Sequence, residues 1–168
     1  MSVASAVVEL LSRCLRDEDP HPDLYDDASE TLALLDTQPP SPLPVLWRFE
    51  MELFQALGFE LQLGRCVESA QTLVPPFRAG IRYRLNEGSF LHPDARASAT
   101  RDGELLPESF GLLARLANSS REFAGRIVVP PRVSHELQSF FAQYLETHLP
   151  VRGHLISLNA LRWSHSSR

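Results

Sequence analysis

Apolar residues recur every three or four positions in three stretches of the first sixty residues, which is the spacing of one face of an α-helix. These stretches cover about residues 3–15, 23–36 and 44–57. Pro44 suits the first turn of the third stretch and Gly58 suits the position just after its end. The positions predicted to face the core are Val3, Val7, Leu10, Leu11 and Cys14, then Leu24, Ala28, Leu32 and Leu35, then Leu46, Phe49, Leu53, Ala56 and Leu57.

The pattern changes in residues 64–103, where prolines and glycines interrupt the chain. Apolar positions alternate with Arg82 and Arg84 in residues 81–85. Such alternation predicts a short strand with one buried face and one solvent-exposed face. Residues 90–91 are its predicted partner across a tight turn.

Helical spacing returns in the last third of the chain. One helix is predicted after Pro107 and a longer one after Pro131, ended by Pro150. Their apolar positions are Phe110, Leu113 and Leu116, then Val133, Leu137, Phe140, Phe141, Tyr144 and His148, with a final short helix at Leu155, Leu158 and Leu161. His148 is predicted to be a core histidine with one hydrogen bond rather than a metal ligand.

These elements predict a mainly α fold, a helical bundle-like domain with a small irregular or β insertion. We expect a helical part at residues 1–65, the insertion at 66–103, and a second helical part at 104–168 that packs with the first as one domain. The two cysteines are far apart in sequence, which argues against a disulfide framework and for a cytoplasmic setting. Neither a signal peptide nor a membrane span is expected.

Charge is distributed unevenly along the chain. All 16 basic residues are arginine, and the net charge is −5. Residues 1–60 hold 3 of the arginines and 12 acidic residues, whereas residues 61–168 hold 13 arginines and 9 acidic residues. The acidic first part would repel nucleic acid, and the later part suits an anionic partner.

Motifs of the common enzyme classes are absent from the sequence, so we expect neither an enzyme nor a cofactor. Cys66 begins a segment that looks like Cys-x-x-Cys without its second ligand, and His92 begins a similar incomplete pair. A structural zinc site uses four ligands. We therefore expect no metal at these degenerate positions; the alternative is an open site completed by Asp94 and water.

Five segments, taken in order along the chain, resemble the C-terminal region of the recombination mediator family RecO. They are residues 9–13 of the opening helix, residues 48–59 (Arg-Phe-Glu-x-x-Leu followed by Leu-Gly-Phe), residues 65–67 at the first zinc pair, residues 83–91 before the second pair, and residues 144–149 with Arg152, Leu155 and Ser157.

The resemblance implies a helical domain interrupted by a small zinc-binding element, acting in DNA repair and recombination. It implies strand annealing and recombinase loading as activities. The implied partners are single-stranded DNA, RecR and the acidic tail of single-stranded-DNA-binding protein. The family's N-terminal OB-fold has no counterpart in these 168 residues, so the chain is either a piece of a longer protein or a shortened homologue.

Arginines are the candidate contact residues. Those predicted to touch DNA phosphates are Arg78, Arg82, Arg84 and Arg152. Those predicted to border an apolar groove for an acidic tail are Arg13 and Arg48. Two alternatives stay open: the strand arginines only make the surface soluble, or the chain is a protein-docking helical module without DNA binding of its own.

Overall fold

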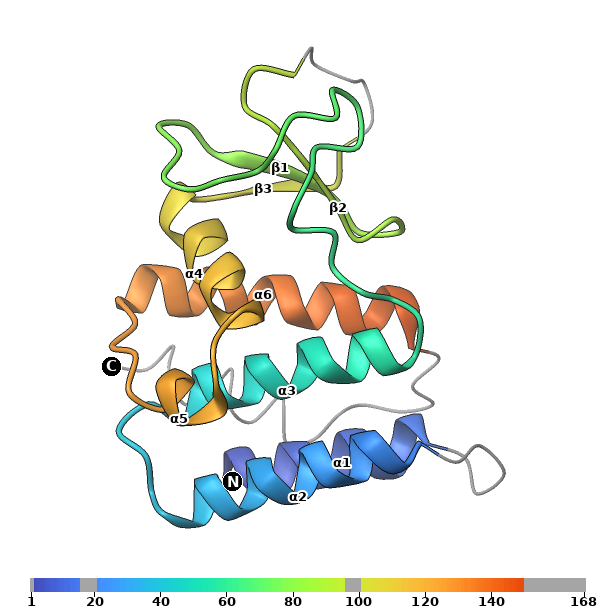
Figure 1. Cartoon of the computed structure of the whole chain (residues 1–168), viewed down its shortest axis with the longest axis vertical. Coiled ribbons are helices and arrows are strands. Elements are labelled where there is room, and N and C mark those ends of the chain that lie inside the picture. Colours follow the sequence, from blue (N-terminus) through green and yellow to red (C-terminus); the bar gives the residue numbers. More distant parts are fainter. Residues whose placement is uncertain (1, 16–20, 96–100, 150–168) are drawn as a thin grey trace.

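Six helices and one three-stranded sheet form within residues 2–15, 21–95 and 101–149, the part of the chain that the computed structural model describes (Figure 1). The helices are α1 (Val3–Cys14), α2 (Pro22–Asp36), α3 (Pro42–Ala56), α4 (Pro107–Ala117), α5 (Arg121–Ala124) and α6 (Pro131–His148), and the strands are β1 (Ile81–Arg84), β2 (Ser89–Leu91) and β3 (Gly103–Leu105). The mainly helical fold with a small β insertion is confirmed. Across the described ranges, none of the helices has the length and apolar character needed to span a bilayer.

Proline begins four of these helices, at Pro22, Pro42, Pro107 and Pro131. Its fixed φ favours the first turn, where its missing N–H would have no helical partner anyway. α1 begins differently, because the Ser2 hydroxyl accepts a hydrogen bond from the Ser5 N–H at 3.3 Å.

α3 lies between α6 and the pair formed by α1 and α2 (Figure 1). It therefore buries more than the single face predicted for it. Trp47 and Phe54 are buried along with the predicted Phe49 and Leu53, whereas Ala56 is exposed. A helix surrounded by partners is apolar on most of its circumference.

The sheet has the order β2-β1-β3, with both pairs antiparallel. The predicted hairpin of β1 and β2 is confirmed, and Tyr83 lies opposite Phe90. Gly88 turns the chain with φ +58°, and a Cβ there would lie 2.4 Å from the Tyr144 hydroxyl, so only glycine fits. β3 was not predicted.

Aromatic rings of α6 connect the sheet to the helices. The Phe140 ring lies 5.1 Å from Tyr83 and 5.9 Å from Phe90, centroid to centroid. The neighbouring Phe141 ring stacks 6.1 Å from Trp47. Both sides of α6 therefore contribute to one continuous core.

Two polar atoms at the end of α6 hold nearby loops. The Tyr144 hydroxyl donates to the Phe59 carbonyl at 2.8 Å, and burial raises the pKa of Tyr144 to about 12. His148 Nε2 donates to the Leu85 carbonyl at 2.7 Å, which confirms the predicted hydrogen bond, although the side chain is half-buried rather than within the core.

Helices that precede the sheet contact helices that follow it: α3 packs against α4 and α5, and α2 packs against α5. The predicted organisation into two helical parts around an insertion, with boundaries at residues 65 and 103, stays a prediction.

Phe140→Ala should lower the free energy of unfolding by about 3–5 kcal/mol, because it removes the ring that joins the sheet to the helices. Phe123→Ala is the matched control, since Phe123 is 45% exposed and should cost less than about 1 kcal/mol. Urea denaturation of both variants measures the difference. Equal losses would show that the aromatic contact between α6 and the sheet does not stabilise the fold.

Candidate functional site

The two strand arginines predicted to face solvent are engaged by other groups of the same chain instead. Arg82 is only 9% exposed, and its Nη2 donates to the Ala95 carbonyl at 2.7 Å. Arg84 forms ion pairs with Glu68 and Glu87. The predicted solvent-exposed strand face is therefore wrong, because the segments before and after the hairpin fold over the middle strand.

Arg78 is the one predicted phosphate contact that the structure places at the surface. Its side chain is exposed in the segment before β1, and within the described ranges no hydrogen bond or ion pair is found for it. Arg152 lies outside the described residues. Of the three predicted DNA contacts within the described residues, Arg78 is exposed, whereas Arg82 and Arg84 are held by other groups of the chain.

Cys66 and His92, the incomplete metal-ligand positions, meet in the insertion. Burial alone would raise the pKa of the Cys66 thiol, but hydrogen bonds from the Ser69 hydroxyl and from the backbone N–H groups of His92, Ser69 and Glu68 lower it. The His92 ring makes a separate hydrogen bond, in which its Nδ1 accepts from the Asp94 N–H at 3.2 Å. In the described part of the chain, no three His, Cys, Asp or Glu side chains gather to hold a metal ion.

Arg13 borders a shallow hollow on α1. The hollow measures about 510 Å³ and is lined by Ala4, Ser5, Val8, Glu9, Ser12 and Arg13. Val8 is 52% exposed, and Arg13 Nη2 lies 3.5 Å from Glu9 Oε1. This surface combines an exposed aliphatic side chain with a cation, the combination that an acidic apolar peptide requires.

Arg48, the other predicted groove residue, faces a different part of the protein. Its Nε donates to the Ser119 carbonyl at 3.3 Å, and its Nη2 lies 3.2 Å from Glu52 Oε1. The structure therefore gives Arg13 and Arg48 separate partners, and the predicted groove between their helix faces is occupied by the core.

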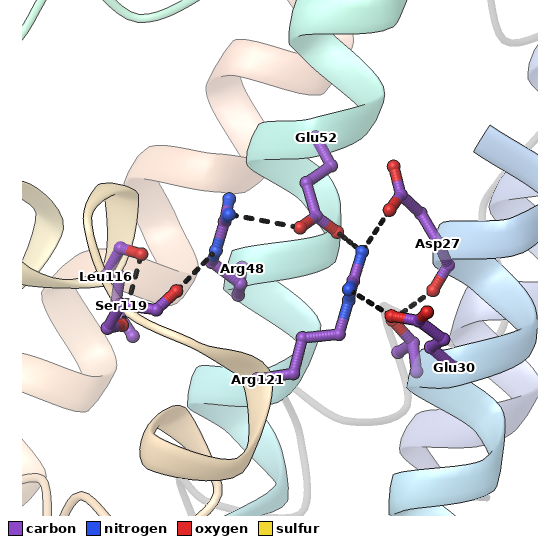
Figure 2. A network of polar contacts seen from close by, with 8 residues as sticks. Asp27, Glu30, Arg48, Glu52, Leu116, Ser119 and Arg121 are labelled. Atoms are coloured by element: carbon purple, nitrogen blue, oxygen red, sulfur yellow. Dashed lines mark hydrogen bonds and ion pairs between the residues drawn. The ribbon is translucent and has the colours of Figure 1, made fainter. Parts of the chain in front are cut away.

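Arg121, at the start of α5, is the centre of a charged cluster that joins three helices (Figure 2). Its guanidinium pairs with Asp27 and, at 2.6 Å, with Glu30 on α2. On α3 it pairs with Glu52 at 2.9 Å, and Arg48 reaches the same carboxylate from the other side (Figure 2). Sequence reasoning missed this cluster because 94 residues separate Arg121 from Asp27.

The centre of the charged cluster is largely withdrawn from water, because the side chains of Arg121 and Glu52 are 15% and 9% exposed. Glu30, at the edge of the cluster, is 68% exposed. Burial raises the pKa of Glu52, and the nearby Arg48 and Arg121 offset only part of that rise. Burial also opposes the charge of Arg121, but Glu52 and Asp27 outweigh it and raise its pKa. Each charge in such a cluster depends on its partner, because an unpaired buried charge is costly.

Two adjoining hollows along α4 were not predicted either. One, of about 530 Å³, lies between residues 75–77, the first part of α4 and the segment 127–133. The other, of about 770 Å³, lies between residues 60–64, residues 72–75 and the second part of α4. They share Pro75, Gly111 and Arg115, and together are called the α4 groove below. No sequence motif marks it, because its walls come from separate segments.

Comparison with known proteins gives a family match over most of the chain. The family described as "Recombination protein O C terminal" matches residues 1–154. The chain is 26% identical over 152 residues to DNA repair protein RecO of Anaeromyxobacter sp. strain K, covering 90% of this chain and 58% of that protein. It is 27% identical over 160 residues to DNA repair protein RecO of Prosthecochloris aestuarii, covering 89% and 61%. It thus spans about three fifths of the length of the curated relatives it matches.

Arg121→Met should lower the free energy of unfolding by about 2–4 kcal/mol, because methionine keeps the apolar stem but leaves Glu52 and Asp27 without their shared cation. Arg101→Met is the matched control: Arg101 pairs with Glu104, but both side chains are more than half exposed, at 56% and 52%. Its loss should stay within about 1 kcal/mol. Equal effects in chemical denaturation would mean that the buried cluster does not fix α5 in place.

Proposed function

Because the chain belongs to the family of C-terminal regions of recombination protein O, we propose that it acts in DNA repair and recombination as a mediator rather than as an enzyme. In this role it assists the annealing of single strands and the loading of a recombinase. The observation that carries the proposal is the family match over residues 1–154, which include every described helix and strand. A cytoplasmic setting is part of the same proposal.

Contacts with DNA are proposed to be few in the described part of this chain. Arg82 and Arg84 are already engaged by Ala95, Glu68 and Glu87. Arg78 is exposed and can approach a phosphate without losing a partner among the described residues. Each phosphate contact on a single strand steepens the dependence of log affinity on log salt concentration by about 0.7.

Arg78→Ala should therefore reduce that salt slope by about 0.7, as measured by fluorescence anisotropy of a labelled single-stranded oligonucleotide. Arg84→Ala should leave the slope unchanged, because its charge is already neutralised by two glutamates. If Arg84→Ala flattened the slope as much as Arg78→Ala, this assignment would be wrong. If the unaltered chain bound no oligonucleotide even at low salt, the protein-docking alternative would replace the DNA contact.

Protein docking is the second candidate function, and the hollow on α1 favours it. Exposed Val8 and the neighbouring Arg13 suit the acidic, apolar tail of single-stranded-DNA-binding protein. Arg48 takes no part in this proposal, because its guanidinium is engaged by Ser119 and Glu52. RecR is a further proposed partner, for which no surface is assigned.

Arg13→Glu should weaken binding of the acidic tail peptide on the order of tenfold, which corresponds to about 1.4 kcal/mol. Glu9→Gln should act in the opposite direction, because it removes a carboxylate that competes with the peptide for Arg13. Isothermal titration calorimetry with both variants tests the pair. Unchanged affinity for the peptide in both variants would show that the tail does not bind at the hollow on α1.

A further inference from the structure

The α4 groove presents apolar side chains on both of its walls. Phe77 and Val128 line the first hollow, and Val128 is 87% exposed. Val74 lines the second hollow and is 66% exposed. Exposed apolar side chains that line a concave surface are typical of sites that bind a partner, because singly scattered exposed residues would not line adjoining hollows.

Gly111 lines both hollows. It is in the interior of α4, where glycine weakens a helix relative to alanine. A Cβ at this position would find its nearest neighbour, the Pro75 Cβ, at 3.8 Å, which is an ordinary contact. Packing within the protein therefore does not require glycine here. Its missing side chain instead keeps the passage between the hollows open.

Arg115 lines both hollows and supplies the cation at their junction. Its side chain is exposed, and among the described residues it forms no hydrogen bond or ion pair. The acidic residues of the groove, Glu60 and Glu108, line different hollows rather than the junction. The complementary ligand therefore carries a carboxylate near its middle and aliphatic groups on each side.

We propose that the α4 groove docks an amphipathic segment of a partner protein, whose carboxylate pairs with Arg115 and whose aliphatic side chains lie against Phe77, Val74 and Val128. The segment crosses α4 at Gly111, where its backbone can approach the helix closely. This interaction goes beyond the contacts proposed above, which use Arg78 and the hollow on α1.

Two labelled synthetic peptides test the groove with the whole chain: one with leucine and glutamate at helical spacing, and one with lysine in place of each glutamate. Fluorescence anisotropy should show the glutamate peptide binding on the order of tenfold tighter, the effect of one well-placed ion pair. Arg115→Glu should reverse that preference, and the gain of lysine-peptide binding separates lost recognition from misfolding. Arg101→Glu, at an exposed arginine that does not line the groove, should leave the preference unchanged.

Gly111→Ala provides an independent readout. It should raise the midpoint of thermal unfolding by about 2 °C, because alanine favours the helix. It should also lower the affinity for the glutamate peptide several-fold, because the added methyl group narrows the passage between the hollows. The proposal is overturned if neither peptide binds, if Arg115→Glu leaves the preference unchanged, or if Gly111→Ala stabilises the chain without weakening the peptide. Each of these outcomes leaves the oligonucleotide and tail-peptide experiments unaffected, so a failure of the groove is distinct from a failure of the proposed function.

Discussion

The ion pairs of the Arg121 guanidinium allow α2 and α3 to pack with the carboxylates of Asp27 and Glu52 close together. Asp27 and Glu52 are near enough that the charge of Asp27 raises the pKa of Glu52. Without a cation between them, both burial and like-charge repulsion would oppose this packing. Arg121 forms ion pairs with both carboxylates, and it comes from α5, a helix of four residues that has little stability of its own.

The position of α5 in turn fixes the chain that follows it. The Gly125 carbonyl accepts a hydrogen bond from the Ser41 N–H at 3.0 Å, and a Cβ on Gly125 would lie 3.1 Å from the Pro39 Cβ. The connector before α3 and the end of α5 therefore pack closely. The segment 127–133, which forms one wall of the α4 groove, continues directly from this contact. The charged cluster and the α4 groove are thus structurally connected through α5 and the segment that follows it, although none of the cluster's residues lines the groove.

The features predicted from the sequence are those that neighbouring residues decide. Proline at the first turn, three- and four-residue spacing and a glycine turn were enough to find α1 to α4, α6 and the β1–β2 hairpin. β3 and α5 have three and four residues, too few for a periodic pattern, and they depend on β1 and on the Arg121 cluster. The exposure of Arg82 was predicted wrongly for the same reason. Alternation describes a single strand, but the burial of the Arg82 side chain depends on other segments that fold over that strand.

Cys66 and His92, the two positions that resemble incomplete zinc pairs in the sequence, are linked by a hydrogen bond from the His92 backbone. The turn at Cys66 still directs the backbone N–H groups of Glu68 and Ser69 toward sulfur, and the N–H of His92 joins them from the second incomplete pair. In a zinc site these donors would stabilise thiolate ligands. Here they surround a single thiol, while Phe77 packs edge-on against the His92 ring at 5.5 Å. Hydrogen bonds and ring contacts therefore link the two halves of the insertion in the described part of the chain.

The uneven charge of the sequence overstates how much cationic surface faces a partner. Within the described residues, Arg82, Arg84 and Arg121 are held by carbonyl or carboxylate oxygens of the same chain, so part of the arginine-rich second half neutralises acidic groups internally. Arg121 in particular offsets the acidic first third by pairing with Asp27, Glu30 and Glu52. Among the described residues, Arg78 and Arg115 are exposed cations without such an oxygen partner, and Arg115 lies beside the apolar side chains of the α4 groove. A continuous stripe suits a phosphate backbone, whereas isolated cations beside aliphatic groups suit amphipathic peptides. The position of Arg115 beside apolar side chains is therefore the feature that supports the proposed docking of a peptide segment in the α4 groove.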